Sequence, residues 1–265
     1  MRSERFHTPG GVAIRVRLPA GQIDIESVDG EETSIEVDAL NDVAHQALER
    51  MVVAQRGGEV TVELEERRSF RLRTPRLGVT IRCPHLADLT VDTVAADVDA
   101  RGRYGRLDVK TVSADVQLEE VEGDARVKSV SGDVRVDRVG GKLGVQSVSG
   151  DLKIERVDGV AELRTVSGDI RVEAAASSVT VQTVSGDQEI AAVTEGTVQA
   201  KSVSGDVTIG VAPGASVWID AKSVSGSTRS ELELSDEQAP AEENGRRIEI
   251  RANALSGDIR VTRAG

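Results

Sequence analysis

Aspartate recurs more regularly than any other side chain of this 265-residue chain that could do chemistry. It closes copies of Val-Ser-Gly-Asp and repeats at a step of 18 residues five times and then 19: Asp97, Asp115, Asp133, Asp151, Asp169, Asp187 and Asp206. Such a row could bind Ca²⁺, which prefers carboxylate and carbonyl oxygens. Calcium β-rolls, however, use a nine-residue glycine-rich repeat that this chain lacks. We therefore expect Ser-Gly-Asp to form a corner whose side chains bond local backbone N–H groups, and weak calcium binding stays open.

A second column carries hydroxyl groups, one residue before the Val of the tetrapeptide: Thr111, Ser129, Ser147, Thr165, Thr183, Ser202 and Ser223. A flat array of threonines can bind ice or another ordered surface. Here half of the column is serine and it adjoins the corner. We therefore expect the hydroxyls to point inward and to hydrogen-bond along the stack of repeats.

The remaining reactive side chains are scattered. His7, His45 and His85 lack the spacing of metal ligands. Cys83-Pro84-His85 brings a thiol near an imidazole without a third orienting group, so a buried structural cysteine is expected. Trp218, the single tryptophan, is expected to cover the end of the repeat array. The sequence thus predicts no catalytic, cofactor-binding or metal-binding residue.

A carbohydrate-active β-helix enzyme is the enzymatic alternative. Such enzymes use paired carboxylates as acid and base. They also need irregular loops to form a cleft and aromatic platforms for sugar rings. Aromatic residues make up only 2% of this chain, and the carboxylates recur in every repeat. The pattern therefore favours a protein that is not an enzyme.

The element that positions these columns is one 18-residue repeat. In residues 142–159, two short alternating runs flank Ser149-Gly150, and Asp158-Gly159 has the chemistry of a turn. Each repeat therefore reads as strand, tight corner, strand and turn. Neither strand is stable alone, so successive repeats must stack as rungs, with parallel pairing about 4.8 Å apart.

Stacking predicts columns of apolar side chains inside the array. One interior column runs Val91, Val109, Val127, Val145, Leu163, Val181, Ala200; another runs Val98, Val116, Val134, Leu152, Ile170, Gln188, Val207. The polar Gln188 marks an irregularity close to the 19-residue step. On the outer face, Asp, a basic residue and an acidic residue alternate, as in Asp169, Arg171 and Glu173.

The predicted fold class is all-β: a single-stranded, right-handed parallel β-solenoid of 18-residue rungs with a small α+β N-terminal cap. Residues 1–85 form the cap region, with one helix at about 41–55 that Asn41 or Asp42 caps and Gly57-Gly58 ends. Residues 16–30 already resemble a rung. The solenoid spans 86–265, is interrupted by an acidic loop at 235–245, and closes with a last rung at 247–262.

Composition and net charge limit the kinds of partner that this protein can be expected to bind. A net charge of −12 disfavours binding to the phosphates of nucleic acids and to anionic membrane surfaces. No 18-residue uncharged apolar run could span a bilayer, and the N-terminus lacks the apolar core of a signal peptide. We therefore expect a cytoplasmic protein without membrane insertion.

The Val-Ser-Gly-Asp ladder, Leu18-Pro19-Ala20-Gly21 near the start and Leu255-Ser256-Gly257-Asp258-Ile259 near the end together resemble a bacterial family. It is an uncharacterised domain family labelled “putative adhesin”. The resemblance covers most of the chain and implies a β-solenoid of unknown function, often associated with the cell envelope. It supplies no catalytic residues.

The functional expectation is a non-enzymatic structural or protein-interaction solenoid, able to bind a protein partner or to associate with itself, because repeat arrays present long faces and open sheet edges. The alternative is a module that binds a cell-envelope glycan.

Overall fold

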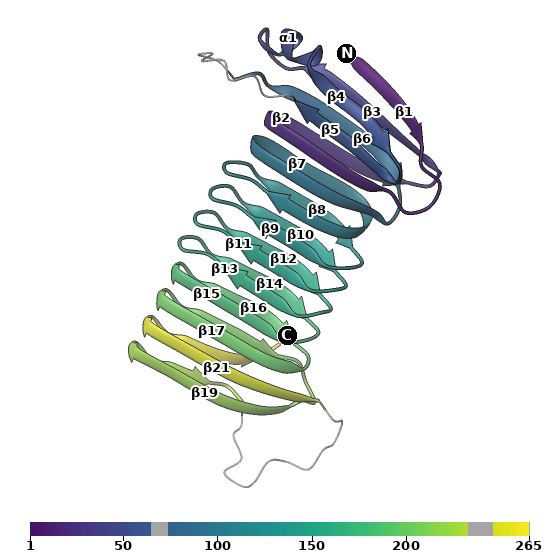
Figure 1. Ribbon diagram of the computed structural model, residues 1–265. Helices are drawn as coiled ribbons and strands as arrows, with labels where there is room; N and C mark the ends of the chain where they lie inside the picture. The colour runs from purple at the N-terminus through teal and green to yellow at the C-terminus, as the bar shows by residue number, and fades with distance from the viewer. Residues whose placement is uncertain (65–73, 233–245, 265) are drawn as a thin grey trace. The chain divides into compact units, whose positions relative to one another are not determined.

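The computed structural model describes residues 1–64, 74–232 and 246–264. The chain divides into two compact units, Met1–Val134 and Arg135–Gly265, and each is built almost wholly of β-strands (Figure 1). The acidic loop expected at 235–245 lies outside the described residues. Among the described helices, none has the length and apolar character needed to cross a membrane.

The first unit contains nine strands and one short helix within its described residues. They are β1 (Arg2–His7), β2 (Ala13–Val28), β3 (Glu32–Ala39), α1 (Ala44–Leu48), β4 (Met51–Arg56), β5 (Glu59–Leu64), β6 (Leu77–Pro84), β7 (Ala87–Lys110), β8 (Val116–Val121) and β9 (Ala125–Lys128).

The long strands β2 and β7 are the first rungs of this unit. They pair in parallel from Ala13↔Asp88 to Glu26↔Arg101, through a corner at which Gly21 lies beside Ala96. The resemblance of residues 16–30 to a rung is therefore confirmed. On the far side of β2, its first half pairs with β5 and its second half with β6, and antiparallel β4, β3 and β1 extend these pairings.

The predicted helix at 41–55 is wrong in length. The helix spans Ala44–Leu48 only, and Met51–Arg56 is β4, which forms an antiparallel hairpin with β5. Asn41 does accept a hydrogen bond from the Ala44 amide, at 3.0 Å, but Gly57-Gly58 is the hairpin turn and not a helix end. β-branched Val52 and Val53 are poor helix residues, and pairing with β5 outweighs the helical spacing of the apolar residues.

The second unit repeats a strand pair along its length, beginning with β10, whose first residue lies at the division. Its strands are β10 (Val134–Val139), β11 (Leu143–Gln146), β12 (Leu152–Val157), β13 (Ala161–Arg164), β14 (Ile170–Ala175), β15 (Val179–Ser185), β16 (Gln188–Val193), β17 (Gly196–Ser204), β18 (Val207–Val211), β19 (Ser216–Ser225), β20 (Thr228–Ser230), β21 (Arg247–Ser256) and β22 (Ile259–Arg263).

The predicted interior columns are confirmed in this unit. Val145 pairs with Leu163, Leu163 with Val181 and Val181 with Ala200, all in parallel and all with no exposed surface. The second column pairs Leu152, Ile170, Gln188 and Val207 in the same way. The core is therefore layered, one row of aliphatic side chains for each rung.

The 19-residue step does not arise at Gln188. Ala175 pairs with Val193, 18 residues later, whereas Val179 pairs with Val198, 19 residues later. The extra residue therefore lies in the turn between β16 and β17. Gln188 keeps its place in the column because its Nε2 donates to the Lys201 carbonyl at 2.7 Å.

The last rung in sequence is not the last rung in space. β21 pairs with β17 on one side and with β19 on the other, and β22 likewise lies between β18 and β20. Figure 1 shows the yellow β21 between the two green strands. The rung formed by β19 and β20 is therefore the outermost of the rungs described in this unit. It carries Trp218, as expected, but that indole is 47% exposed.

Candidate interaction surface

The corner of each rung turns the chain from the first strand of the rung into the second and sends the Val of Val-Ser-Gly-Asp outward. In the rung of β13 and β14, Leu163 and Thr165 point inward, so alternation places Val166 outside. Gly168 then adopts φ +130°, a region that residues with a Cβ rarely visit. A Cβ at this position would also collide with the carbonyl oxygen of Gly150 in the neighbouring rung. Only glycine allows the rungs to approach here.

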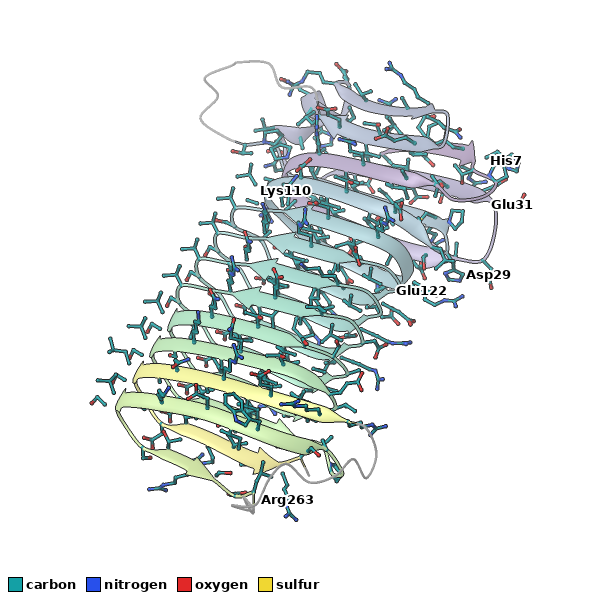
Figure 2. The ribbon with its side chains drawn as sticks, turned by 60° about the horizontal axis from the view of Figure 1, so that its bottom comes forward. His7, Asp29, Glu31, Lys110, Glu122 and Arg263 are labelled. Atoms are coloured by element: carbon teal, nitrogen blue, oxygen red, sulfur yellow. The ribbon has the colours of Figure 1, made fainter. Side chains whose placement is uncertain are left out.

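The exposed residues of successive corners form one line in the second unit, which we call the valine ridge. Its members are exposed apolar residues, from 44% for Val203 to 79% for Val224: Val148, Val166, Val184, Val203, Leu255 and Val224. Their order in space follows the pairing of the adjacent serines, in which Ser256 lies between Ser204 and Ser225. Side chains project at the successive turns of the stack (Figure 2). In the first unit, the corners at Val94, Val112 and Val130 expose the same residue type.

The two sides of the valine ridge differ in charge. On the side of the first strand, two residues before the ridge, stand cations and amides: Gln146, Arg164, Gln182, Lys201, Asn253 and Lys222. On the side of the second strand stand five carboxylates: Asp151, Asp169, Asp187, Asp206 and Asp258. Because the chain turns at the corner glycine between them, these two columns flank the ridge on opposite faces.

The aspartate column joins rungs to one another. The Oδ1 atom of Asp169 accepts the amide of Asp187 at 2.8 Å, and Asp187 accepts that of Asp206 at 2.8 Å. The same bond, 2.8–3.1 Å long, recurs through both units. For the aspartates, the expectation of local backbone bonds is therefore wrong: the acceptor lies one rung before its donor. The carboxylate satisfies an N–H that the tight corner leaves without a strand partner.

The hydroxyl column points inward, as expected, but most of its hydrogen bonds stay within one rung; among the described residues of the column, Ser223 alone bonds along the stack, to the carbonyl of Gly257 in the neighbouring rung at 2.8 Å. Thr165 Oγ1 donates to the carbonyl of Ser167 at 3.2 Å, and Ser147 and Thr183 bond the residue two positions on in the same way. These hydroxyls are buried and are removed from any outer surface. Each of these hydroxyls bonds a carbonyl of its own corner, because the turn of the chain brings the carbonyl two residues on within reach.

Cys83 is a buried structural cysteine, as expected. Burial raises the pKa of its thiol to about 12, so the sulfur stays protonated at neutral pH. Its Sγ lies 3.8 Å from the carbonyl of Glu26, and His85 turns to another partner.

His85 belongs to a serine–histidine–aspartate arrangement that the sequence reasoning missed. Its Nδ1 lies 2.8 Å from Ser27 Oγ, and its Nε2 lies 3.4 Å from Asp29 Oδ1. Ser27 Oγ is buried and already accepts the Arg103 amide at 2.7 Å, while Asp29, labelled in Figure 2, is fully exposed. A nucleophile needs an accessible oxygen, and the orienting carboxylate needs burial. The arrangement is therefore structural: through Ser27 it connects the end of β2 to His85 and to the Arg103 amide of β7.

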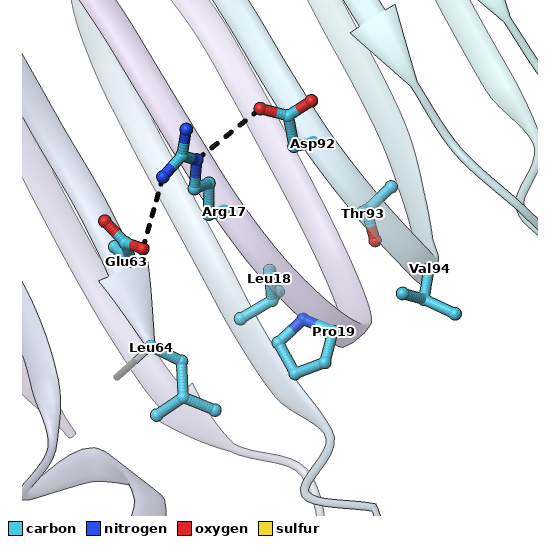
Figure 3. A pocket seen from close by; sticks show the side chains of 8 residues that line it. All are labelled: Arg17, Leu18, Pro19, Glu63, Leu64, Asp92, Thr93 and Val94. Carbon is cyan, nitrogen blue, oxygen red and sulfur yellow. Dashed lines mark hydrogen bonds and ion pairs between the residues drawn. The ribbon is translucent and has the colours of Figure 1, made fainter. Parts of the chain in front are cut away.

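A shallow hollow of about 410 Å³ in the first unit brings two carboxylates near each other (Figure 3). Arg17 lies between them, with NH1 3.4 Å from Glu63 Oε1 and Nε 3.5 Å from Asp92 Oδ2. One guanidinium therefore pairs with both carboxylates, and the hollow is lined by a cluster of ion pairs.

Metal ligands do not converge in the described part of the chain: no group of three His, Cys, Asp or Glu residues could hold an ion there. The aspartates stand one per rung, and each bonds its neighbour. The geometry of the column is that of a structural ladder.

Rungs of short parallel strands, layered aliphatic columns and glycine corners define the class of β-solenoid repeat proteins. Within that class, a family model matches residues 13–262, and the chain belongs to the Toastrack DUF4097 family. No functionally curated protein matches it.

One solved structure supports the fold, and a second matches the chain with a lower TM-score. A “putative adhesin” from Parabacteroides distasonis is similar, with 11% identity, a TM-score of 0.55 and coverage of 98% of this chain and 96% of that chain. A “putative adhesin” from Bacteroides fragilis has 14% identity, a TM-score of 0.45 and the same coverage. At such identity, the first likeness shows a shared fold alone.

Proposed function

We propose that this protein is a non-enzymatic interaction scaffold that binds protein, copies of itself included, through a surface generated by its repeat. The observation that carries the proposal is the valine ridge. Alternation requires an outward residue at this position, but it does not require an apolar one. An apolar residue nevertheless stands at every corner of the second unit. Exposed apolar side chains that form a continuous line are typical of interaction sites.

The rest of the outer surface differs from this ridge. Ion pairs such as Lys153–Glu155 at 3.1 Å and Arg171–Glu189 at 3.0 Å cover the strand faces of the second unit. Exposed pairs contribute at most about 1 kcal/mol each, but they keep these faces hydrated. We therefore expect a partner to bind at the corners and not on the strand faces.

Molar mass, measured by light scattering over a wide concentration range, tests the self-association in this proposal. We expect the mass to rise from that of the 28.1 kDa chain toward a closed multiple. A mass that stays at one chain up to millimolar concentration would contradict self-association and leave binding to another protein as the remaining form of the proposal.

Glycan binding is a second candidate, favoured by one observation. Trp218 is half-exposed on the outermost strand of the second unit, and sugar rings stack on exposed indoles. Because Trp218 is the single tryptophan, its fluorescence reports this site alone. Saturable quenching by soluble peptidoglycan fragments, absent with free glucose, would support glycan binding. A flat titration would contradict it.

A further inference from the structure

We propose that the valine ridge of the second unit is a self-association surface, on which a second copy of this chain packs ridge against ridge with both stacks running in the same direction. This inference rests on the proposed function and deepens it, since it names the surface, the partner and their orientation.

The spacing of the ridge favours a second copy. Its six side chains stand one per rung, about 4.8 Å apart, and extend over about 24 Å. Another copy carries the same spacing, so every apolar residue of one ridge meets an apolar residue of the other. Identical side chains facing one another in register form dry, interdigitated contacts between sheets.

The charges on the two flanks of the valine ridge determine how the two copies are oriented relative to each other. One flank of the ridge holds Arg164, Lys201 and Lys222 with amides between them, and the other holds the aspartate column. A two-fold axis parallel to the stacking direction places the aspartates of each copy opposite the cationic flank of the other. Arg164 then faces the partner copy's aspartate at the same rung, as does Lys201.

The opposite orientation is disfavoured by the same columns. A two-fold axis across the stack would place the two aspartate columns against each other. Like charges that face each other across an interface oppose association. The parallel arrangement also reduces the self-repulsion of a chain with net charge −12, because it intersperses the two signs.

The first test replaces ridge residues in the full chain and measures association by sedimentation velocity. We expect Val166→Glu with Val184→Glu to weaken association about 100-fold or more, because it places facing carboxylates in the apolar line. The matched control is Val160→Glu. Val160 is also exposed, at 41%, but it precedes β13 whereas Val166 follows it, so it stands at the other end of that strand. The control should change association less than twofold.

The outcomes separate the two proposals. If the unmodified chain is monomeric at all concentrations, self-association itself is contradicted. If the unmodified chain associates and the ridge variant associates equally well, self-association stands and the ridge assignment is overturned. Circular dichroism and the urea midpoint show whether the ridge variant is folded. If it is not, Val166→Ser with Val184→Ser provides the same comparison without new charges.

Single cysteines test the orientation. We expect Val148→Cys and Val224→Cys, at the two ends of the ridge, each to be joined to its own copy by a short bis-maleimide, because parallel stacks bring like residues together. Cys83 is buried and stays protonated, so it does not compete. Cross-linking only in a mixture of the two variants would indicate antiparallel stacks and overturn the proposed orientation.

Discussion

At the scale of single residues, two carboxylates of the second unit are held ionised by different means. For Asp158, partial burial opposes ionisation. Hydrogen bonds from Arg138 at 3.0 Å and Arg156 at 2.7 Å overcome it and lower the pKa below its usual value. For Asp258, the Ser227 amide at 2.8 Å lowers the pKa. Both carboxylates therefore favour the folded chain when they are ionised.

This linkage predicts a loss of stability in acid. A carboxyl whose pKa is lower in the folded chain stabilises it above the unfolded pKa, near 4, and this contribution disappears as the pH falls through the folded value. We expect the urea midpoint to decline below about pH 4. Asp158→Asn should lower the free energy of unfolding at pH 7 by about 0.5 kcal/mol, since both arginines of its ion pairs are half-exposed. It should also flatten the decline as the pH falls below about 4. An identical pH profile for variant and parent would contradict this.

Gln188 is a polar residue in an apolar column, and it leads to the second prediction. Its Oε1 is buried without a hydrogen-bond partner among the described residues, while its neighbours in the column are Ile170 and Val207. We expect Gln188→Leu to raise the free energy of unfolding by about 1 kcal/mol, because it removes an unsatisfied acceptor. The reverse change, Ile170→Gln, should lower it by about 2 kcal/mol or more. If Gln188→Leu is destabilising, the prediction is contradicted, and the hydrogen bond to the Lys201 carbonyl contributes more to stability than the unsatisfied Oε1 costs.

At the scale of elements, the corner glycine decides how closely rungs approach. We expect Gly168→Ala to destabilise the chain by about 2 kcal/mol or more, since the new Cβ meets both a positive φ and the backbone of the next rung. Gly144→Ala in β11 is the matched control, because a Cβ there has open space. Urea unfolding of the two variants checks this. Equal urea midpoints for the two variants would contradict this and show that the corner backbone shifts to accommodate the new Cβ.

The rungs could be predicted from the sequence because the repeat presents each element several times. Alternation around Leu163 and Thr165 also implies an outward Val166, so the ridge was within reach of sequence reasoning. The bonding of Asp169 was not, because its donor lies 18 residues away and depends on the rung spacing. The helix at 41–55 failed for a related reason. Apolar residues stand at helical spacing from Ala44 to Val52, and the pairing with β5 that makes Met51–Arg56 a strand is not visible in that local pattern.

At the scale of the whole chain, the repeat places an apolar residue at the same position of successive rungs, and these residues together form a surface. A single exposed valine is ordinary on any protein. Repetition at rung spacing aligns six apolar residues between a cationic and an acidic column, and no rung contains that surface alone. The proposed function therefore depends on the whole array of rungs.

The order of the final rungs is also a property of the whole chain, because β21 follows β19 in the sequence yet lies between β17 and β19. Strands paired on both sides have their amides protected, whereas an outermost strand leaves about half of its amides open to solvent. We therefore expect hydrogen exchange, followed by mass spectrometry, to be slower in residues 247–256 than in residues 216–225. Residues 196–204, in β17, are the control and should match 247–256. Faster exchange in 247–256 than in 216–225 would mean that the rungs stack in sequence order, and Leu255 would then end the valine ridge in place of Val224.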